Sequence, residues 1–188
     1  MRTLTVFNSV TLDGYFTAAN GDVSWAHAGS DEPEFSAFVV NNAEGGGMLL
    51  FGRITYEMMA GFWPTPMAAE HNPVVAERMN SLPKLVFSRT LDRASWSNTT
   101  VLKGNLAAEI RKLKYEPGPN MAILGSGSIV AQLAQERLID EYQVVVNPVV
   151  LGQGRTLFEG LKNMLGLKLT RSRAFNNGKT FLAYEPLG

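Results

Sequence analysis

A short apolar run passes directly into a glycine-containing turn in the stretch Ala122-Ile123-Leu124-Gly125-Ser126-Gly127-Ser128-Ile129. The run Met121–Leu124 is typical of a buried strand, and the residues from Ser128 to Gln135 predict a helix with one apolar face. A strand that enters a helix through such a tight turn is the repeating unit of parallel α/β sheets. Two glycines at this turn would also let backbone N–H groups approach a pyrophosphate.

Other short apolar runs repeat the strand pattern on both sides of this turn. In residues 4–10, Leu4, Val6 and Val10 alternate with a second set that includes Phe7, and we interpret this stretch as a strand covered on both faces of a sheet. Near the C-terminus, Asn176-Asn177-Gly178 separates two strand patterns, and Asn-Gly in that position strongly predicts a β-hairpin. The predicted strands are residues 4–10, 48–51, 85–87, 121–124, 142–150, 167–175 and 179–185.

Predicted helices alternate with these strands. Three of them run from Pro33 to about Asn42, from Arg53 to about Ala60, and from Ser128 to Gln135. Two more begin after the N-cap residues Asn72 and Asn105. The first is expected to end before Gly45-Gly46-Gly47, and residues 11–32 form a long segment of the kind that is usually functional or disordered. The pattern predicts a three-layer α/β/α fold with a mostly parallel central sheet and a C-terminal antiparallel hairpin. We expect a single domain over residues 1–188.

The composition excludes several classes of protein. Hydrophobic residues make up 45% of the 188 residues and charged residues 18%, which is an ordinary globular balance. Lysine plus arginine equals aspartate plus glutamate at 17 each, so no overall basic charge would attract nucleic acid or an anionic membrane. The chain has no cysteine, and its two histidines lack metal-ligand spacing, so we expect no metal site. No run approaches the roughly 20 apolar residues that span a bilayer, and we expect a cytoplasmic protein.

Three predicted strand ends carry chemistry that binds anions. In a parallel sheet, ligands bind outside the carboxyl ends of the strands, where helix N-termini and arginines supply N–H donors. The residues are Gly52, Arg53 and Thr55 after one strand, Ser88 and Arg89 after a second, and Gly125, Ser126, Gly127, Ser128 and Ile129 after a third. Taken singly, each has a structural explanation, because a glycine can end a strand, an arginine can lie at the surface, and Ser128 can cap its helix.

The third turn differs from the Rossmann dinucleotide fingerprint. The pattern G-x-G-x-x-G would need a small residue at position 130, which is Val130, and no strand ending in a ribose-binding acid follows at about 20 residues. Arginines without such an acid favour a 2′-phosphate. We therefore expect NADPH rather than NADH as the cofactor.

In this order and spacing, the motifs resemble the dihydrofolate reductase superfamily, and within it the C-terminal reductase domain of the bacterial riboflavin-biosynthesis bifunctional deaminase-reductase. The carrying segments are residues 9–16, 52–57, 86–89 and 125–128 and, most specific of all, Pro148-Val149-Val150-Leu151-Gly152-Gln153-Gly154-Arg155-Thr156-Leu157-Phe158. The resemblance implies NADPH binding at the three strand ends, a covering loop in the region 11–25 and a homodimer. It also implies that residues 152–154 form a loop near the active site, with Gly154 beside the substrate. A bulge or turn between strands is the alternative for Gly152 and Gly154.

The resemblance further implies hydride transfer from NADPH to a small heterocyclic substrate, as in 5-amino-6-(5-phosphoribosylamino)uracil reductase. The chain departs from the full riboflavin enzyme because it carries no deaminase domain, and its lack of cysteine excludes that domain's zinc site. A stand-alone reductase is therefore expected, with its small-molecule substrate left open. The alternatives are a dihydrofolate or pterin reductase, or a non-catalytic nucleotide-binding protein on the same scaffold.

Two acids are candidates for supplying the proton that accompanies hydride transfer. Asp13 lies after the first predicted strand, and Glu34 begins the first helix in a setting that resembles the acid-bearing region of folate reductases. Structural roles are the favoured interpretation for both, as a turn-forming Asp-Gly and a helix-dipole partner. Trp25 and Trp63 could stack on a flat heterocyclic substrate, with core packing as an equal alternative.

Overall fold

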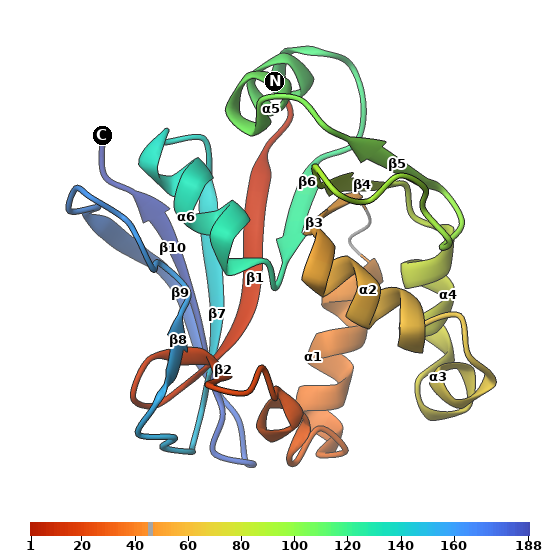
Figure 1. The fold of residues 1–188 in the computed structure, drawn as a ribbon. Coiled ribbons are helices and arrows are strands. Elements are labelled where there is room, and N and C mark those ends of the chain that lie inside the picture. Colours follow the sequence, from red (N-terminus) through yellow and green to blue (C-terminus); the bar gives the residue numbers. More distant parts are fainter. Residues whose placement is uncertain (45–46) are drawn as a thin grey trace.

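The computed structural model describes residues 1–44 and 47–188, which form a central sheet flanked by helices (Figure 1). The strands of this sheet are β1 (Leu4–Thr11), β3 (Met48–Gly52), β4 (Lys84–Phe87), β5 (Thr99–Leu102), β6 (Met121–Leu124), β7 (Glu141–Asn147), β9 (Leu167–Ala174) and β10 (Thr180–Pro186). They lie in the order β5-β4-β3-β6-β1-β7-β10-β9. The pairs from β5 to β7 are parallel, whereas β10 is antiparallel to both β7 and β9. The predicted mostly parallel sheet with a C-terminal hairpin is confirmed.

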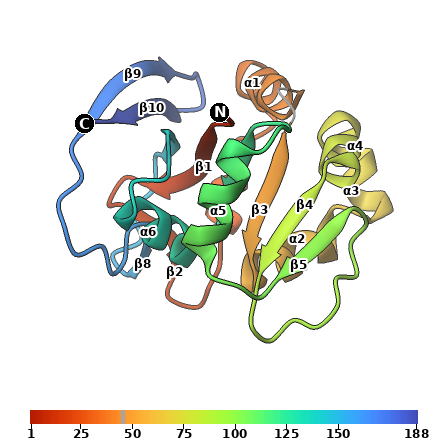
Figure 2. The same ribbon diagram turned by 90° about the horizontal axis from the view of Figure 1, so that it is seen from above.

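Helices cover both faces of the sheet and complete the three layers. On one face, α5 (Leu106–Tyr115) and α6 (Gly127–Gln135) pack against β1, with Ile110 and Val130 buried beside Val6. On the other face lie α1 (Pro33–Glu44), α2 (Arg53–Phe62) and α4 (Pro73–Ser81), where Tyr56 and Phe51 share a second core. Figure 2 shows the β9–β10 hairpin at one edge of the sheet and β5 at the other. Gly45 and Gly46, which follow the first predicted helix, lie outside the described residues.

Several short elements escaped the sequence patterns. The segment 11–32 contains β2 (Tyr15–Ala18) and the 3₁₀ helix η1 (Ser24–His27), and α3 (Pro66–His71) precedes α4. β2 pairs antiparallel with β8 (Gly154–Thr156) as a separate ribbon. Such strands are too short for a period of two to be visible. Conversely, β7 ends at Asn147 instead of continuing to residue 150, because Pro148 has no N–H to donate to the sheet.

Candidate active site

A large hollow lies at the carboxyl ends of the parallel strands. Its lining includes Ser9 from β1, Gly52 from β3, Ser88 after β4 and Gly125 after β6. The hollow has a volume of about 2200 Å³, and its lining continues from the carboxyl ends of the strands as far as Thr3 and Asn120, which precede β1 and β6. A pocket for one small ligand occupies roughly 300–1,000 Å³. The hollow therefore has room for a large cofactor and a separate small substrate.

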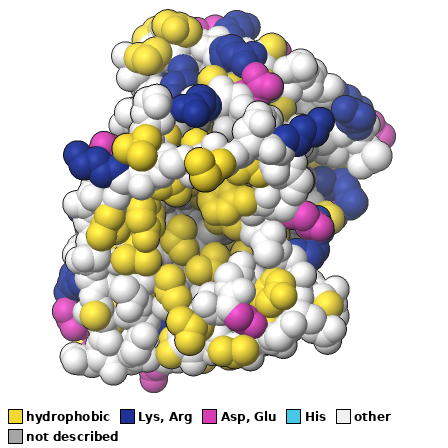
Figure 3. Space-filling model, turned by 90° about the vertical axis from the view of Figure 1, so that its left-hand side faces the viewer, with side chains coloured by type: hydrophobic (Ala, Val, Ile, Leu, Met, Phe, Trp, Pro, Cys, Tyr) yellow, Lys and Arg dark blue, Asp and Glu magenta, His cyan; other side chains and the backbone are white. Residues whose placement is uncertain are grey.

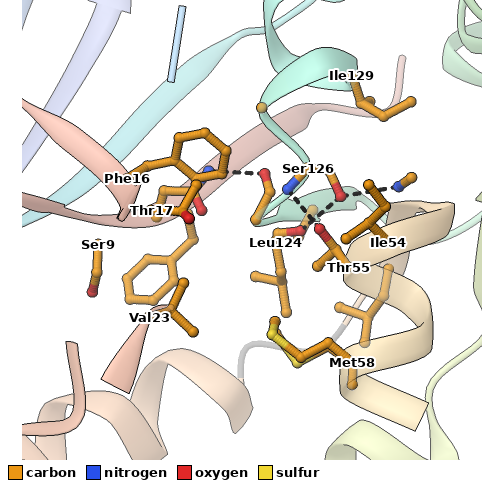
Figure 4. A pocket seen from close by; sticks show the side chains of 18 of the residues that line it. Ser9, Phe16, Thr17, Val23, Ile54, Thr55, Met58, Leu124, Ser126 and Ile129 are labelled. Atoms are coloured by element: carbon orange, nitrogen blue, oxygen red, sulfur yellow. Dashed lines mark hydrogen bonds between the residues drawn. The ribbon is translucent and has the colours of Figure 1, made fainter. Parts of the chain in front are cut away.

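Two hydrogen bonds hold two of the predicted glycine turns together, and a third braces the second turn internally (Figure 4). The Gly52 N–H donates to Ser126 Oγ over 2.9 Å, and the Ser126 N–H donates to Thr55 Oγ1 over 3.0 Å. The Ser126 hydroxyl in turn donates to the Leu124 carbonyl over 3.1 Å. The side chains of Thr55 and Ser126 thus fix the turns to each other, so the N-termini of α2 and α6 lie side by side. Their first-turn N–H groups are the donors left for a ligand.

The second turn, Gly125 to Ser128, leaves no space for a side chain at either of its glycines. Gly125 and Ser126 both have a φ of 58°, and Ser126, not Ser128, is the N-cap residue of α6. A left-handed residue followed by a helical one forms a concave nest of N–H groups that binds anions. A Cβ atom on Gly125 would lie 2.7 Å from Thr55 Cγ2, and one on Gly127 would lie 2.7 Å from Phe16 Cζ. The turn is therefore packed directly between α2 and β2.

Cationic side chains lie at the same strand ends. Arg53 lines the hollow and forms an ion pair with Glu57 at 2.8 Å. Arg89 is exposed and also lines the hollow. Ser88 Oγ accepts hydrogen bonds from the backbone N–H groups of Thr90 and Leu91, so this hydroxyl shapes the turn that carries Arg89. All three predicted strand ends thus border one hollow.

Asp13 lies outside the residues that line the hollow and joins two loops. Its carboxylate accepts hydrogen bonds from the Thr11 hydroxyl at 2.6 Å and from the backbone N–H groups of Leu151 and Gly152, the latter at 2.7 Å. The hydrogen bond from Thr11, together with those from the two amides, lowers the pKa of Asp13. The structure places this carboxylate as a brace between the β1–β2 turn and the loop after β7.

Glu34 also lies outside the lining of the hollow. Its carboxylate pairs with Arg173 at 2.5 Å and is 3.5 Å from the Asn176 side-chain amide. Both partners belong to the C-terminal hairpin region, so this contact ties the start of α1 to β9. Like Asp13, Glu34 lies in a position where it stabilises a tertiary contact.

The predicted substrate residues occupy different surroundings. Trp63 lines the hollow, and its indole N–H is 3.1 Å from the Met59 sulfur. Trp25 is not among the lining residues, and its indole N–H donates to the Asp22 carbonyl at 3.3 Å. Gly154 lies in β8, where a Cβ atom would be 2.4 Å from the Thr17 carbonyl oxygen, next to a register shift in the β2–β8 pair. Its lack of a side chain therefore allows the close approach of β8 to β2.

Sequence reasoning missed an exposed apolar stripe on α2. Ile54 is 69% exposed, Met58 46% and Phe62 41%, and all three line the hollow. Phe16 and Val23 lie across the open space from Ile54 and Met58 (Figure 4). The spacing of four residues is visible in the sequence, but such a stripe normally indicates a core-facing helix. Only the tertiary structure shows that it faces an open space.

Two further properties bear on the kind of site. Within residues 1–44 and 47–188, no group of three or more histidine, aspartate or glutamate side chains comes together as a metal site. In the same part of the chain, no helix has both the length and the apolar character needed to cross a membrane.

The sheet order and the C-terminal hairpin define an α/β protein with the dihydrofolate reductase-like fold. More specifically, the chain belongs to the RibD C-terminal domain family, whose model matches residues 2–181.

Two proteins resemble the chain over nearly its whole length. The uncharacterized protein YyaP of Bacillus subtilis (strain 168) is 29% identical over 177 residues, which cover 94% of this chain and 91% of YyaP. The crystal structure of a candidate riboflavin biosynthesis protein of Shewanella sp. PV-4 has a TM-score of 0.76 at 25% identity. The alignment covers 99% of each of these two chains.

Two more distant structures share the fold. The deaminase/5-amino-6-(5-phosphoribosylamino)uracil reductase of Thermotoga maritima aligns with a TM-score of 0.67 at 14% identity, over 99% of this chain and 57% of that one. A dihydrofolate reductase of Enterococcus faecalis, complexed with NADP(H) and RAB-propyl, aligns with a TM-score of 0.65 at 15% identity, over 99% and 97% of the two chains. The family and these neighbours support a reductase of the riboflavin-biosynthesis kind.

Proposed function

We propose that this protein is an NADPH-dependent reductase that transfers a hydride to a small heterocyclic substrate bound in the hollow. The observation that carries the proposal is the fixed pairing of the α2 and α6 N-termini through Gly52, Ser126 and Thr55, with Arg89 at the next strand end. Helix N-termini favour phosphate groups because their N–H groups and dipoles point at the ligand. Family membership and the NADP(H) complex of the similarly folded dihydrofolate reductase support a nicotinamide cofactor.

The residues present fit a dinucleotide phosphate. The nest at Ser126 and Gly127 and the first turn of α2 would hold the pyrophosphate, and Arg89 would pair with the 2′-phosphate. When bound, NADPH supplies the hydride. The chain orients the substrate between β1 and α2, and the apolar walls around Phe16 exclude water from the reacting groups. Because Asp13 and Glu34 are engaged outside the hollow, we assign the accompanying proton to water.

Replacing Arg89 with alanine should weaken NADPH binding by about tenfold, or about 1.4 kcal/mol, and leave NADH binding within about twofold of wild type. The reason is that only NADPH carries the 2′-phosphate. Quenching of tryptophan fluorescence during titration with each cofactor measures both affinities, since Trp63 lines the hollow.

Arg93→Ala is the matched control. Arg93 is also exposed, lies only four residues after Arg89, and does not line the hollow. Equal losses for NADPH and NADH in the Arg89 variant would contradict the 2′-phosphate role. If neither cofactor quenches the wild-type protein, the proposed function is wrong. Oxidation of NADPH with a panel of aminopyrimidines and dihydropterins then separates an enzyme from a nucleotide-binding protein without catalysis.

We also propose that the protein is a homodimer that buries an open apolar face of the sheet. Val10, Val144, Val146 and Leu182 are half-buried, with Val10 beside Val146 and Val144 beside Leu182. Because side chains alternate along a strand, these four residues face the same side of the sheet as Tyr142. Tyr142 packs in the core under α6, whereas none of the four belongs to that core. Figure 3 shows this side of the molecule as a hollowed, hydrophobic face with lysines and arginines around it.

Val144→Lys should convert the dimer to a monomer in sedimentation equilibrium without unfolding the protein, because a lysine in a closed apolar interface would lose its hydration. Thr100→Lys, an exposed change on the distant strand β5, should leave the dimer intact. A wild-type protein that sediments as a monomer would refute the proposal, as would a Val144→Lys variant that remains dimeric.

A further inference from the structure

The order of the strands divides the hollow into two halves. Arg89 follows β4, the two glycine turns follow β3 and β6, and β1 comes next in the sheet. Three interstrand spacings of about 4.8 Å separate β4 from β1, which is roughly 14 Å. A dinucleotide with its phosphates at the first three strand ends leaves the space between β1, β2, α1 and α2 for the substrate. We call this space the substrate half.

The walls of the substrate half are apolar. Ile54 and Met58 project from α2 on one side, and Phe16 and Val23 project from the β2 region on the other (Figure 4). Phe35 and Val39 of α1 belong to the same lining. The polar groups between these walls include the hydroxyls of Ser9 and Thr17. The Thr17 hydroxyl already donates to the Ala18 carbonyl at 2.8 Å, and the Asn8 side-chain amide donates to the Gly125 carbonyl at 3.0 Å. The polar groups of this half, which also include Ser36 and Asn42, are all uncharged on β1, β2 and α1.

The charges at the substrate half do not form an anion site. Of the described residues that line the hollow from β1, β2, η1, α1 and the loop between η1 and α1, only His27 and Asp31 are ionisable, and both are exposed. A carboxylate at Asp31 opposes the binding of any anion. Lys179 lies nearby, but it is buried, and its Nζ donates to the Ala26 carbonyl and to Asn147 Oδ1.

The remaining basic residues of the hollow lie elsewhere or are already paired. Arg53 pairs with Glu57, Lys103 with Asp92, and Arg155 with Glu159. Lys162 lies at the far end of α6, because its backbone N–H donates to the side chain of Gln135, the last residue of that helix. Gln135 lies eight residues after the first residue of α6, which is a separation of roughly 12 Å. His71 belongs to α3 and Arg78 to α4, and neither helix is one of the four elements that enclose the substrate half.

We propose that the substrate half takes up an uncharged heterocyclic molecule and rejects one that carries a phosphate or a carboxylate. This proposal rests on the proposed function and names its class of substrate. A phosphate there would lose its hydration between Phe16 and Met58 without gaining a cation as partner. The reduced bond would be a C=N or C=O bond of a neutral ring, which excludes a phosphoribosylated pyrimidine.

Two pairs of ligands that differ only in charge test this proposal. They are quinoxaline with quinoxaline-2-carboxylate, and 5-amino-6-(ribosylamino)uracil with its 5′-phosphate. Affinities are measured by isothermal titration of the full-length protein, with and without NADPH. The uncharged member of each pair should bind at least about tenfold more tightly. A charged member that binds as tightly as its partner would overturn the proposal, as would a lack of binding by both uncharged members. A failure of NADPH itself to bind would instead overturn the proposed function.

A substitution on α2 tests whether this helix contributes to the preference for uncharged over charged ligands. Met58→Lys should reduce the preference for the uncharged ligand by at least about tenfold, because it places a cation opposite Phe16 and Val23. Met164→Lys adds the same charge at a residue that is 94% exposed and outside the lining, so it should keep the wild-type preference. If a folded Met58→Lys variant, verified by circular dichroism, binds the charged ligands as weakly as wild type, then the substrate does not occupy this half and the proposal is wrong.

Discussion

Gly125→Val is expected to lower the free energy of unfolding by about 3 kcal/mol and to abolish measurable NADPH binding. A left-handed conformation costs a residue other than glycine about 1–2 kcal/mol, and an overpacked side chain costs about 1–3 kcal/mol more. Gly125 has a φ of 58°, and its new Cβ atom would lie 2.7 Å from Thr55 Cγ2. Displacement of Thr55 would also break its hydrogen bond with the Ser126 N–H, which aligns the two helix N-termini. Urea unfolding and cofactor titration measure the two effects.

Gly61→Ala is the control for this substitution. Gly61 lies in α2, and its added Cβ atom would meet nothing within 4 Å. Alanine is the better helix former, so this variant should be as stable as wild type or up to about 1 kcal/mol more stable, with normal cofactor affinity. If the valine variant at position 125 unfolds at the wild-type urea concentration and still binds NADPH, the turn does not have the role described.

Lys179→Met is expected to lower the free energy of unfolding by about 3 kcal/mol, because each buried polar group that loses its partner costs about 1–3 kcal/mol. Lys179 is 2% exposed, and burial lowers its pKa. Its Nζ donates to the Ala26 carbonyl at 2.7 Å and to Asn147 Oδ1 at 2.5 Å, and lies 5.0 Å from the centre of the Phe35 ring. This one side chain therefore attaches η1 to the end of β7.

The loss of this attachment should also be visible locally. Hydrogen–deuterium exchange of residues 22–30 should accelerate in Lys179→Met, because the segment loses one of its hydrogen bonds to the C-terminal region and keeps the one from the Asn177 amide to the Gly29 carbonyl. Lys168→Met, at an exposed position on β9, should alter neither stability nor exchange. Unchanged exchange in the Lys179 variant would show that η1 is held by other means.

Much of the fold follows from local patterns. The Asn-Gly dipeptide at 177–178 predicted the hairpin, and Gly178 has the positive φ of 83° that such a turn uses. Asn72 and Asn105 cap α4 and α5 through their side chains, as their positions before helical patterns indicated. In contrast, β2 and β8 form only because residues about 140 positions apart pair in space, and neither strand is long enough to show a period of its own.

By itself, the sequence determined where the glycine and arginine turns that border the hollow lie. Gly52, Gly125 and Arg89 each follow a buried strand, and the conformation of such a turn depends on the residues within it. Only the tertiary structure decided the roles of Asp13 and Glu34, whose partners Gly152 and Arg173 are each 139 positions away. It also decided that Ile54 and Met58 face the hollow instead of the core. Periodicity shows that a helix has an apolar face, but what that face meets depends on how the whole chain packs.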